Sequence, residues 1–187
     1  MNSDQKIKEA HQTLLMYGMF SIIMLFAGLT SAYIVSKKGL GSQWDDIILP
    51  NEFYISTLMI CISSFFGHFA INYITSDNFK MLTKSLFLTI LFGALFFLLQ
   101  VFGWYALVKN GKFLSGNNVA SSYLYVLTLT HIIHFIGGLI PLIVVYIRSI
   151  RRQYTSSNFN GVKLVVRFWH FLTILWLYLF LFLLFIN

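Results

Sequence analysis

Residues 128–141 read TLTHIIHFIGGLIP, a stretch that places two histidines and two adjacent glycines inside an otherwise apolar segment. His131 and His134 are three residues apart, so on a helix they share one face. Gly137 and Gly138 continue the same line about one turn further on. The stretch therefore predicts a helix that carries two imidazoles and a glycine step.

The surrounding segment 121–147 contains no Asp, Glu, Lys or Arg, and it is long enough to cross the hydrocarbon core of a membrane. The two imidazoles lie about halfway along this span. Two interpretations stay open at this point. Either the histidines are neutral hydrogen-bonding groups between helices, or they serve a functional site as ligands or proton carriers.

The composition defines the class of protein. The chain has 187 residues, of which 58% are hydrophobic and only 10% are charged, and its mean hydropathy is +0.76. About a quarter of the residues in a soluble domain are charged, so the sequence predicts an integral membrane protein. The net charge of +7 is spread over short loops, which favours a role in membrane topology over nucleic-acid binding. A single cysteine, Cys61, excludes an intramolecular disulfide and a Cys-rich zinc site.

Apolar segments of membrane-spanning length occur five times, separated by short polar connections. We therefore predict an all-α integral membrane protein with one transmembrane domain, residues 1–187. The expected spans are approximately 14–35, 53–75, 85–108, 121–147 and 164–186.

The distribution of lysine and arginine predicts the orientation, because cytoplasmic loops carry an excess of both. With five spans, the N-terminal tail and the second and fourth loops lie on one side. That side would hold Lys6, Lys8, Lys80, Lys84, Arg148, Arg151, Arg152 and Lys163, whereas the other would hold only Lys37, Lys38, Lys109 and Lys112. We expect the N-terminus inside and the C-terminus outside.

The histidines are expected at different depths in the membrane, which does not favour a single metal site. His68 and His170 lie about seven residues, or about 10 Å, from the inner boundary, whereas His134 lies about 20 Å from it. Ligands of one zinc ion must lie within about 2.3 Å of it, which this offset does not favour. A haem held between His68 and His170, or a proton relay through histidines, stays open as the mark of an independent membrane redox or transport protein.

Four short motifs follow one another along the last three spans. They read KSLFLTI at 84–90, LLQ at 98–100, THIIHFIG at 130–137 and FWHF at 168–171, with Trp176 shortly after. In this order the chain resembles subunit III of the haem-copper terminal oxidases, in the five-helix form of that family. The similarity extends over nearly the whole chain.

The resemblance implies an accessory core subunit that has no catalytic residue and no metal or other cofactor of its own. Haem and copper would belong to partner subunits, with subunit I as the main contact and subunit II and other respiratory subunits nearby. The resemblance also implies a multi-pass protein of the bacterial cytoplasmic membrane that binds phospholipids. The electron donor, cytochrome c or a quinol, would bind elsewhere in the complex.

The residues of this chain that match the family's motif are His131, His134, Trp169, His170, Gln100 and Gly137, and the resemblance implies structural roles for them. The roles expected of Gly138, His68 and the three arginines follow from their chemistry and position. Gly137 and Gly138 are expected in helix packing. Lipid binding or structural hydrogen bonding is expected of His68, Gln100, His131, His134, Arg148, Arg151, Arg152, Trp169 and His170.

Four positions differ from the family pattern, in which each carries an acidic residue. Here they are Ile22, Gly103, Lys163 and Thr173. A lipid-holding and structural role is therefore expected rather than a role in proton uptake.

Overall fold

The computed structural model describes residues 3–44, 46–115, 119–154 and 159–186, and within these ranges the chain is helical without any strand. The helices are α1 (Ser3–Leu40), α2 (Asn51–Thr75), α3 (Phe79–Lys109), α4 (Val119–Ile150) and α5 (Asn160–Ile186), with a short 3₁₀ turn η1 (Gly41–Gln43) after α1. All five α-helices are long and apolar enough to cross a membrane. The predicted all-α fold with five long apolar helices is confirmed.

The helices are longer than the apolar spans from which they were predicted. α1 begins at Ser3 instead of about residue 14, because the polar residues before the apolar segment continue the same helix. α3 begins at Phe79 instead of about residue 85, and the side chain of Asn78 accepts a hydrogen bond from the backbone N–H of Met81. An Asn cap of this kind fixes a helix start independently of hydropathy.

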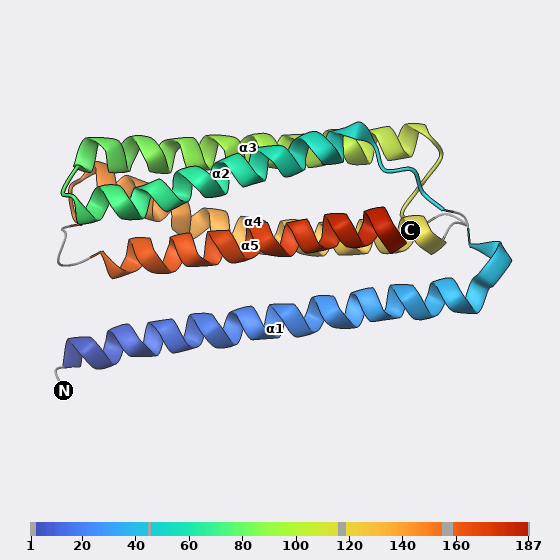
Figure 1. The fold of residues 1–187 in the computed structure, drawn as a ribbon, viewed down its shortest axis with the longest axis horizontal. Coiled ribbons are helices and arrows are strands. Elements are labelled where there is room, and N and C mark those ends of the chain that lie inside the picture. The colour runs from blue at the N-terminus through green and yellow to red at the C-terminus, as the bar shows by residue number, and fades with distance from the viewer. Residues whose placement is uncertain (1–2, 45, 116–118, 155–158, 187) are drawn as a thin grey trace.

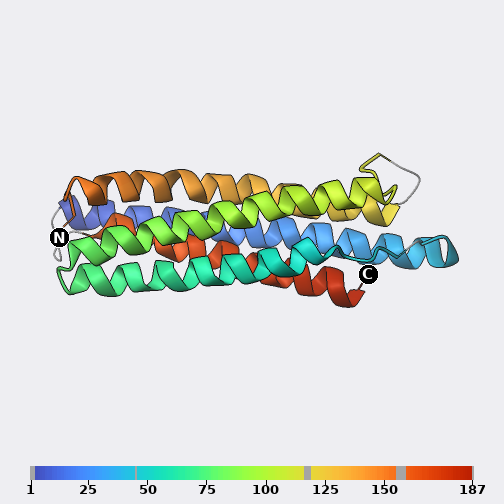
Figure 2. The same cartoon turned by 90° about the horizontal axis from the view of Figure 1, so that it is seen from above.

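The helices form three layers (Figures 1 and 2). α2 pairs with α3 in one outer layer, α4 pairs with α5 in the middle, and α1 runs along the other outer side. Among the helices, α1 contacts only α4 and α5 in the described part of the chain. The middle layer is covered from both sides, so α4 and α5 supply much of the buried surface, while most of α1 faces outward.

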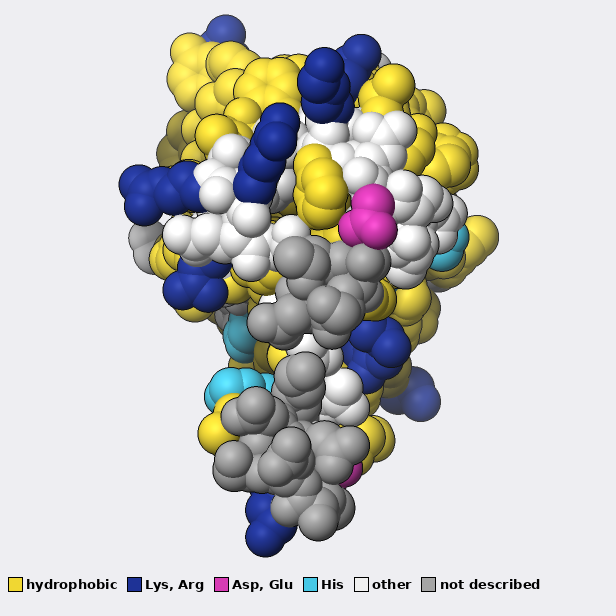
Figure 3. All heavy atoms as spheres, turned by 90° about the vertical axis from the view of Figure 1, so that its left-hand side faces the viewer, with side chains coloured by type: hydrophobic (Ala, Val, Ile, Leu, Met, Phe, Trp, Pro, Cys, Tyr) yellow, Lys and Arg dark blue, Asp and Glu magenta, His cyan; other side chains and the backbone are white. Residues whose placement is uncertain are grey.

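One end of the bundle collects most of the basic side chains. The start of α1, the turn between α2 and α3, the end of α4 and the start of α5 all meet there (Figure 1). Figure 3 looks onto this end and shows much more Lys and Arg surface than Asp and Glu surface. The basic residues that the sequence predicts on one side of the membrane thus lie at one end of the bundle. The side of the membrane that this end faces stays a prediction.

Candidate functional site

His131 lies in the centre of the bundle and packs against aromatic rings. It is fully buried, and its ring centroid lies 6.5 Å from Phe26, 6.1 Å from Phe96 and 5.2 Å from Trp176. Among the described residues, neither of its ring nitrogens has a hydrogen-bond partner. The imidazole therefore fills space between α1, α3, α4 and α5 as an aromatic ring would.

Replacing His131 by phenylalanine should raise the free energy of unfolding by about 1 kcal/mol, because a buried polar group without a partner costs about that much or more. Denaturation of the purified chain in detergent measures the change. The same substitution at His134 is the control and should lower stability slightly, since it removes a bonded nitrogen. A loss of 2 kcal/mol or more at His131 would show that its nitrogens are engaged.

His134 is half-buried on the same helix face. Its Nδ1 lies 2.7 Å from the carbonyl oxygen of Thr130, so this nitrogen is the one that donates. Its ring centroid is 5.8 Å from that of Phe26 on α1. Phe26 therefore covers both histidines of the motif and links α1 to α4.

His68 and His170 form a separate pair between α2 and α5. The ring centroids of His68 and His170 are 6.1 Å apart, in agreement with the equal depth expected for them. His170 is half-buried, and its Nδ1 lies 2.5 Å from Oγ of Ser64, whereas His68 is exposed. No group of three or more His, Cys, Asp and Glu suitable for a metal ion occurs within the described ranges.

Several polar groups of the bundle interior, unlike His131, form hydrogen bonds across helices. Gln100 on α3 donates from Nε2 to Oγ of Ser56 on α2 at 2.7 Å. Trp104 on α3 donates from Nε1 to Oγ1 of Thr128 on α4 at 3.1 Å. These bonds place a donor and an acceptor of neighbouring helices at the same depth, which fixes the register of the helices.

The two tryptophans of α5 bind hydroxyl groups of α2. Trp169 donates from Nε1 to Oγ of Ser63 at 3.0 Å, and Trp176 donates to Oγ1 of Thr57 at 3.0 Å. Ser63 in turn donates to the carbonyl oxygen of Thr89 on α3 at 2.7 Å. Trp169 was among the residues singled out from the sequence, but its hydroxyl partner was not.

The hydroxyl row of α2 has a sequence signal that the motif analysis missed. Ser56 and Ser63 are seven residues apart, and so are Thr57 and Ser64. Residues seven apart lie on one helix face about two turns from each other. A repeated Ser/Thr pair at this spacing in a membrane span therefore predicts a polar stripe for interhelical hydrogen bonds.

Three glycines lie where another helix packs closest. A Cβ atom at Gly93 would lie 2.8 Å from the ring of Trp169, and one at Gly138 would lie 2.6 Å from Cδ1 of Leu172. At Gly103, a Cβ would lie 2.6 Å from the ring of Phe53. Aromatic and aliphatic side chains thus occupy the space beside these glycines.

The adjacent glycines of the opening motif face in different directions. Gly138 is buried against α5, whereas a Cβ at Gly137 would meet nothing within 4 Å. Exposed isoleucines lie on the same side of α4 as Gly137, at Ile133 and Ile140. Gly138 therefore serves packing inside this chain, and Gly137 leaves a small notch in the outer surface of α4.

An apolar groove of about 420 Å³ lies between α1 and α5. It is lined by Ile23, Phe26, Ala27, Phe171, Ile174, Leu175 and Tyr178. Arg148, Arg151 and Arg152 lie elsewhere, exposed at the end of α4.

Comparison with known proteins identifies relatives over most of the chain. A family model described as cytochrome c oxidase subunit III matches residues 4–187. The probable cytochrome c oxidase subunit 3 of Nocardia farcinica is 30% identical over 165 residues, which cover 86% of this chain and 80% of that protein. The cytochrome bo(3) ubiquinol oxidase subunit 3 of Buchnera aphidicola is 30% identical over 164 residues, which cover 87% and 84%. The cytochrome c oxidase subunit 3 of Corynebacterium diphtheriae is 28% identical, with coverage of 88% and 82%.

Proposed function

The chain belongs to the cytochrome c oxidase subunit III family, the non-catalytic subunit of haem-copper oxidases, and from this we propose that it stabilises subunit I of such an oxidase by helix packing and by bound phospholipids. The observation that supports the structural role is the set of hydrogen bonds between helices inside the bundle. Four side chains donate a hydrogen bond to a hydroxyl group of a neighbouring helix: Gln100, Trp104, Trp169 and Trp176. The alternative of an independent redox or transport protein is not supported by the relatives.

We place the contact with subunit I on the outer side of α4. Gly137 lies there between exposed isoleucines, with Ile133 at 68% and Ile140 at 59% exposed. Small residues in a membrane helix allow the backbone of another helix to come close, and the resulting van der Waals contacts drive association in lipid. The notch at Gly137 supports such a contact, with the isoleucines packing on either side of it.

Phospholipids would occupy two kinds of place on the molecule. The groove between α1 and α5 has the apolar lining and the volume that acyl chains require. Arg148 and Arg151 lie exposed at the end of α4, where each basic residue contributes about 1 kcal/mol to attraction by an anionic membrane surface. We assign His170 to structural hydrogen bonding with Ser64, and the exposed His68 beside it to lipid contact or a structural polar role, rather than to a cofactor.

The proposed setting is a bacterial cytoplasmic membrane with the N-terminus inside. The basic end of the bundle supports this orientation because cytoplasmic segments are rich in Lys and Arg (Figure 3). Haem and copper belong to partner subunits in this proposal. Subunit II and other respiratory subunits complete the assembly, and both cytochrome c and quinol oxidases occur among the named relatives.

Affinity purification tests the proposal directly. The chain with a C-terminal tag is purified from native membranes in mild detergent, and co-purifying proteins are identified by mass spectrometry. We expect a haem-bearing subunit I in near-equal amount, together with oxygen reduction by the purified complex. An untagged strain treated identically is the control. Recovery of the chain alone, or haem bound in equal amount to the isolated chain, would contradict the proposal.

A further inference from the structure

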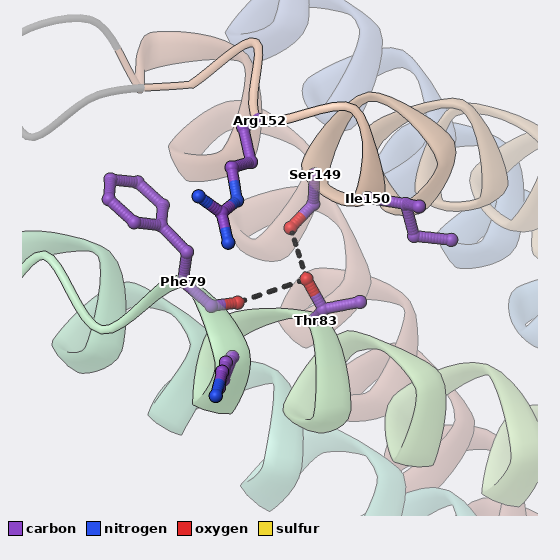
Figure 4. Close-up of a pocket in the computed structure, with 6 residues that line it drawn as sticks. Phe79, Thr83, Ser149, Ile150 and Arg152 are labelled. Carbon is purple, nitrogen blue, oxygen red and sulfur yellow. Dashed lines mark hydrogen bonds between the residues drawn. The ribbon is translucent and has the colours of Figure 1, made fainter.

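A pocket of about 300 Å³ opens at the basic end of the bundle, between the first turns of α3 and the last turn of α4 (Figure 4). It combines two cationic side chains, two hydroxyl groups and two apolar side chains. They are Lys80, Arg152, Thr83, Ser149, Phe79 and Ile150.

The two hydroxyl groups at this pocket can redirect a hydrogen toward a ligand. Oγ1 of Thr83 lies 3.0 Å from Oγ of Ser149 and 3.0 Å from the carbonyl oxygen of Phe79 (Figure 4). The Phe79 carbonyl is four residues before Thr83 in the helix, so it can also accept the helical N–H bond of Thr83. Thr83 is therefore free to donate to Ser149 instead, which leaves the Ser149 hydroxyl to donate to a ligand.

Arg152 adopts a backbone conformation that is unusual for its residue type. Its φ is 52°, and it ends α4 with its N–H donating to the carbonyl of Ser149 at 3.0 Å. Glycine is favoured in this left-handed position, because any side chain there is strained. The guanidinium reaches from the end of α4 toward the hydroxyl pair and α3 (Figure 4).

The positive charges of this pocket are not neutralised by acidic partners. No carboxylate lines the pocket, and in the described part of the chain the one ion pair joins Lys37 to Asp46. A lysine, a guanidinium and a hydroxyl converging on one cavity suit a phosphate group, which accepts several charge-assisted hydrogen bonds.

Apolar and aromatic side chains lie close to the pocket on both helices. Ile150 lines the pocket itself. About one turn further from this end lie Phe87 on α3 and Tyr146 on α4, whose ring centroids are 6.2 Å apart. A ligand with a phosphate head and an acyl tail would fit a polar pocket with apolar side chains beside it, whereas inorganic phosphate would contact only the polar pocket.

We propose that Lys80, Thr83, Ser149 and Arg152 form a binding site for the phosphate of an anionic phospholipid, whose acyl chains lie along α3 and α4. This inference rests on the proposed lipid-holding function and adds a defined site to it. Arg152 is distinguished from its neighbour Arg151, which is exposed at the same end but does not line the pocket.

Native mass spectrometry of the full-length chain in detergent tests the site, with phosphatidylglycerol, phosphatidylcholine of the same acyl chains and inorganic phosphate as probes. Arg152→Gly removes the guanidinium and suits the left-handed backbone. We expect it to weaken phosphatidylglycerol binding about fivefold to tenfold, in keeping with the loss of one hydrogen bond from the guanidinium to the phosphate. Arg151→Gln is the matched control at the same end. It removes the same charge but no group that lines the pocket, and no membrane surface is present in detergent, so it should change binding less than twofold.

The outcomes separate the site from general attraction to charge and from the proposed function. Equal losses for Arg152→Gly and Arg151→Gln, or equal binding of phosphatidylglycerol and phosphatidylcholine, would overturn the site. Displacement of the lipid by millimolar inorganic phosphate would overturn the lipid assignment. Thr83→Val, which keeps the side-chain shape, should also weaken binding and covers the case in which Arg152→Gly does not fold. Co-purification with subunit I together with any overturning result would refute this inference alone.

Discussion

Replacing Gly138 by leucine should lower the free energy of unfolding by about 2–3 kcal/mol, because inserting bulk into a closely packed interior forces neighbouring side chains and backbone apart. A Cβ at this position would already lie 2.6 Å from Leu172 and 3.3 Å from the ring of Phe168. Leu172 is only 1% exposed, so it has little room to move aside. Denaturation of the purified chain in detergent measures the loss.

The matched substitution at Gly137 should reduce association with subunit I while leaving the stability of the isolated chain nearly unchanged. Because a Cβ there meets nothing within 4 Å, Gly137→Leu should leave the stability of the isolated chain within about 0.5 kcal/mol of the original. The same change fills the notch on the outer side of α4, so it should reduce the amount of subunit I recovered with the tagged chain severalfold. Normal recovery after Gly137→Leu would refute the proposed contact surface, whereas an unchanged stability after Gly138→Leu would refute the internal packing role.

The two glycines also show where sequence reasoning stops. The helices were predictable because the thickness of a membrane sets a minimum length for an apolar segment, and the chain contains such segments at clear intervals. The rotation of each helix about its axis is set by packing against other helices, which hydropathy does not report. Gly137 and Gly138 are adjacent in sequence and received the same assignment, yet one faces α5 and the other faces outward.

The candidate residues illustrate the same limit. Gln100 and Trp169 stood out as polar groups inside apolar spans, but their partners Ser56 and Ser63 come from another helix. The pairing of Thr83 with Ser149 joins residues from α3 and α4, and no local pattern connects them. Arg152 was chosen with two neighbouring arginines on charge alone, and only its backbone conformation sets it apart.

Trp169→Ala should be the most damaging single substitution, with a loss of about 3–5 kcal/mol in the free energy of unfolding. Trp169 is almost fully buried and joins α5 to three other helices. Its Nε1 binds Ser63 on α2, its ring centroid lies 5.0 Å from that of Phe135 on α4, and its edge packs against Gly93 on α3. Alanine would remove all three contacts at once and leave a cavity in the middle layer.

Two further variants separate the packing of the Trp169 ring from its hydrogen bond. Trp169→Phe keeps an aromatic ring and should cost only about 1–2 kcal/mol, because Ser63 still donates to the carbonyl of Thr89. In Ser63→Ala the indole N–H stays buried without its acceptor, so this smaller change should cost about 1–3 kcal/mol. The double variant should show a coupling of about 0.6 kcal/mol, the average for hydrogen bonds between membrane helices, and at most about 1.7 kcal/mol. Additive losses would mean that this bond contributes nothing, and that Trp169 stabilises the bundle by the packing of its ring alone.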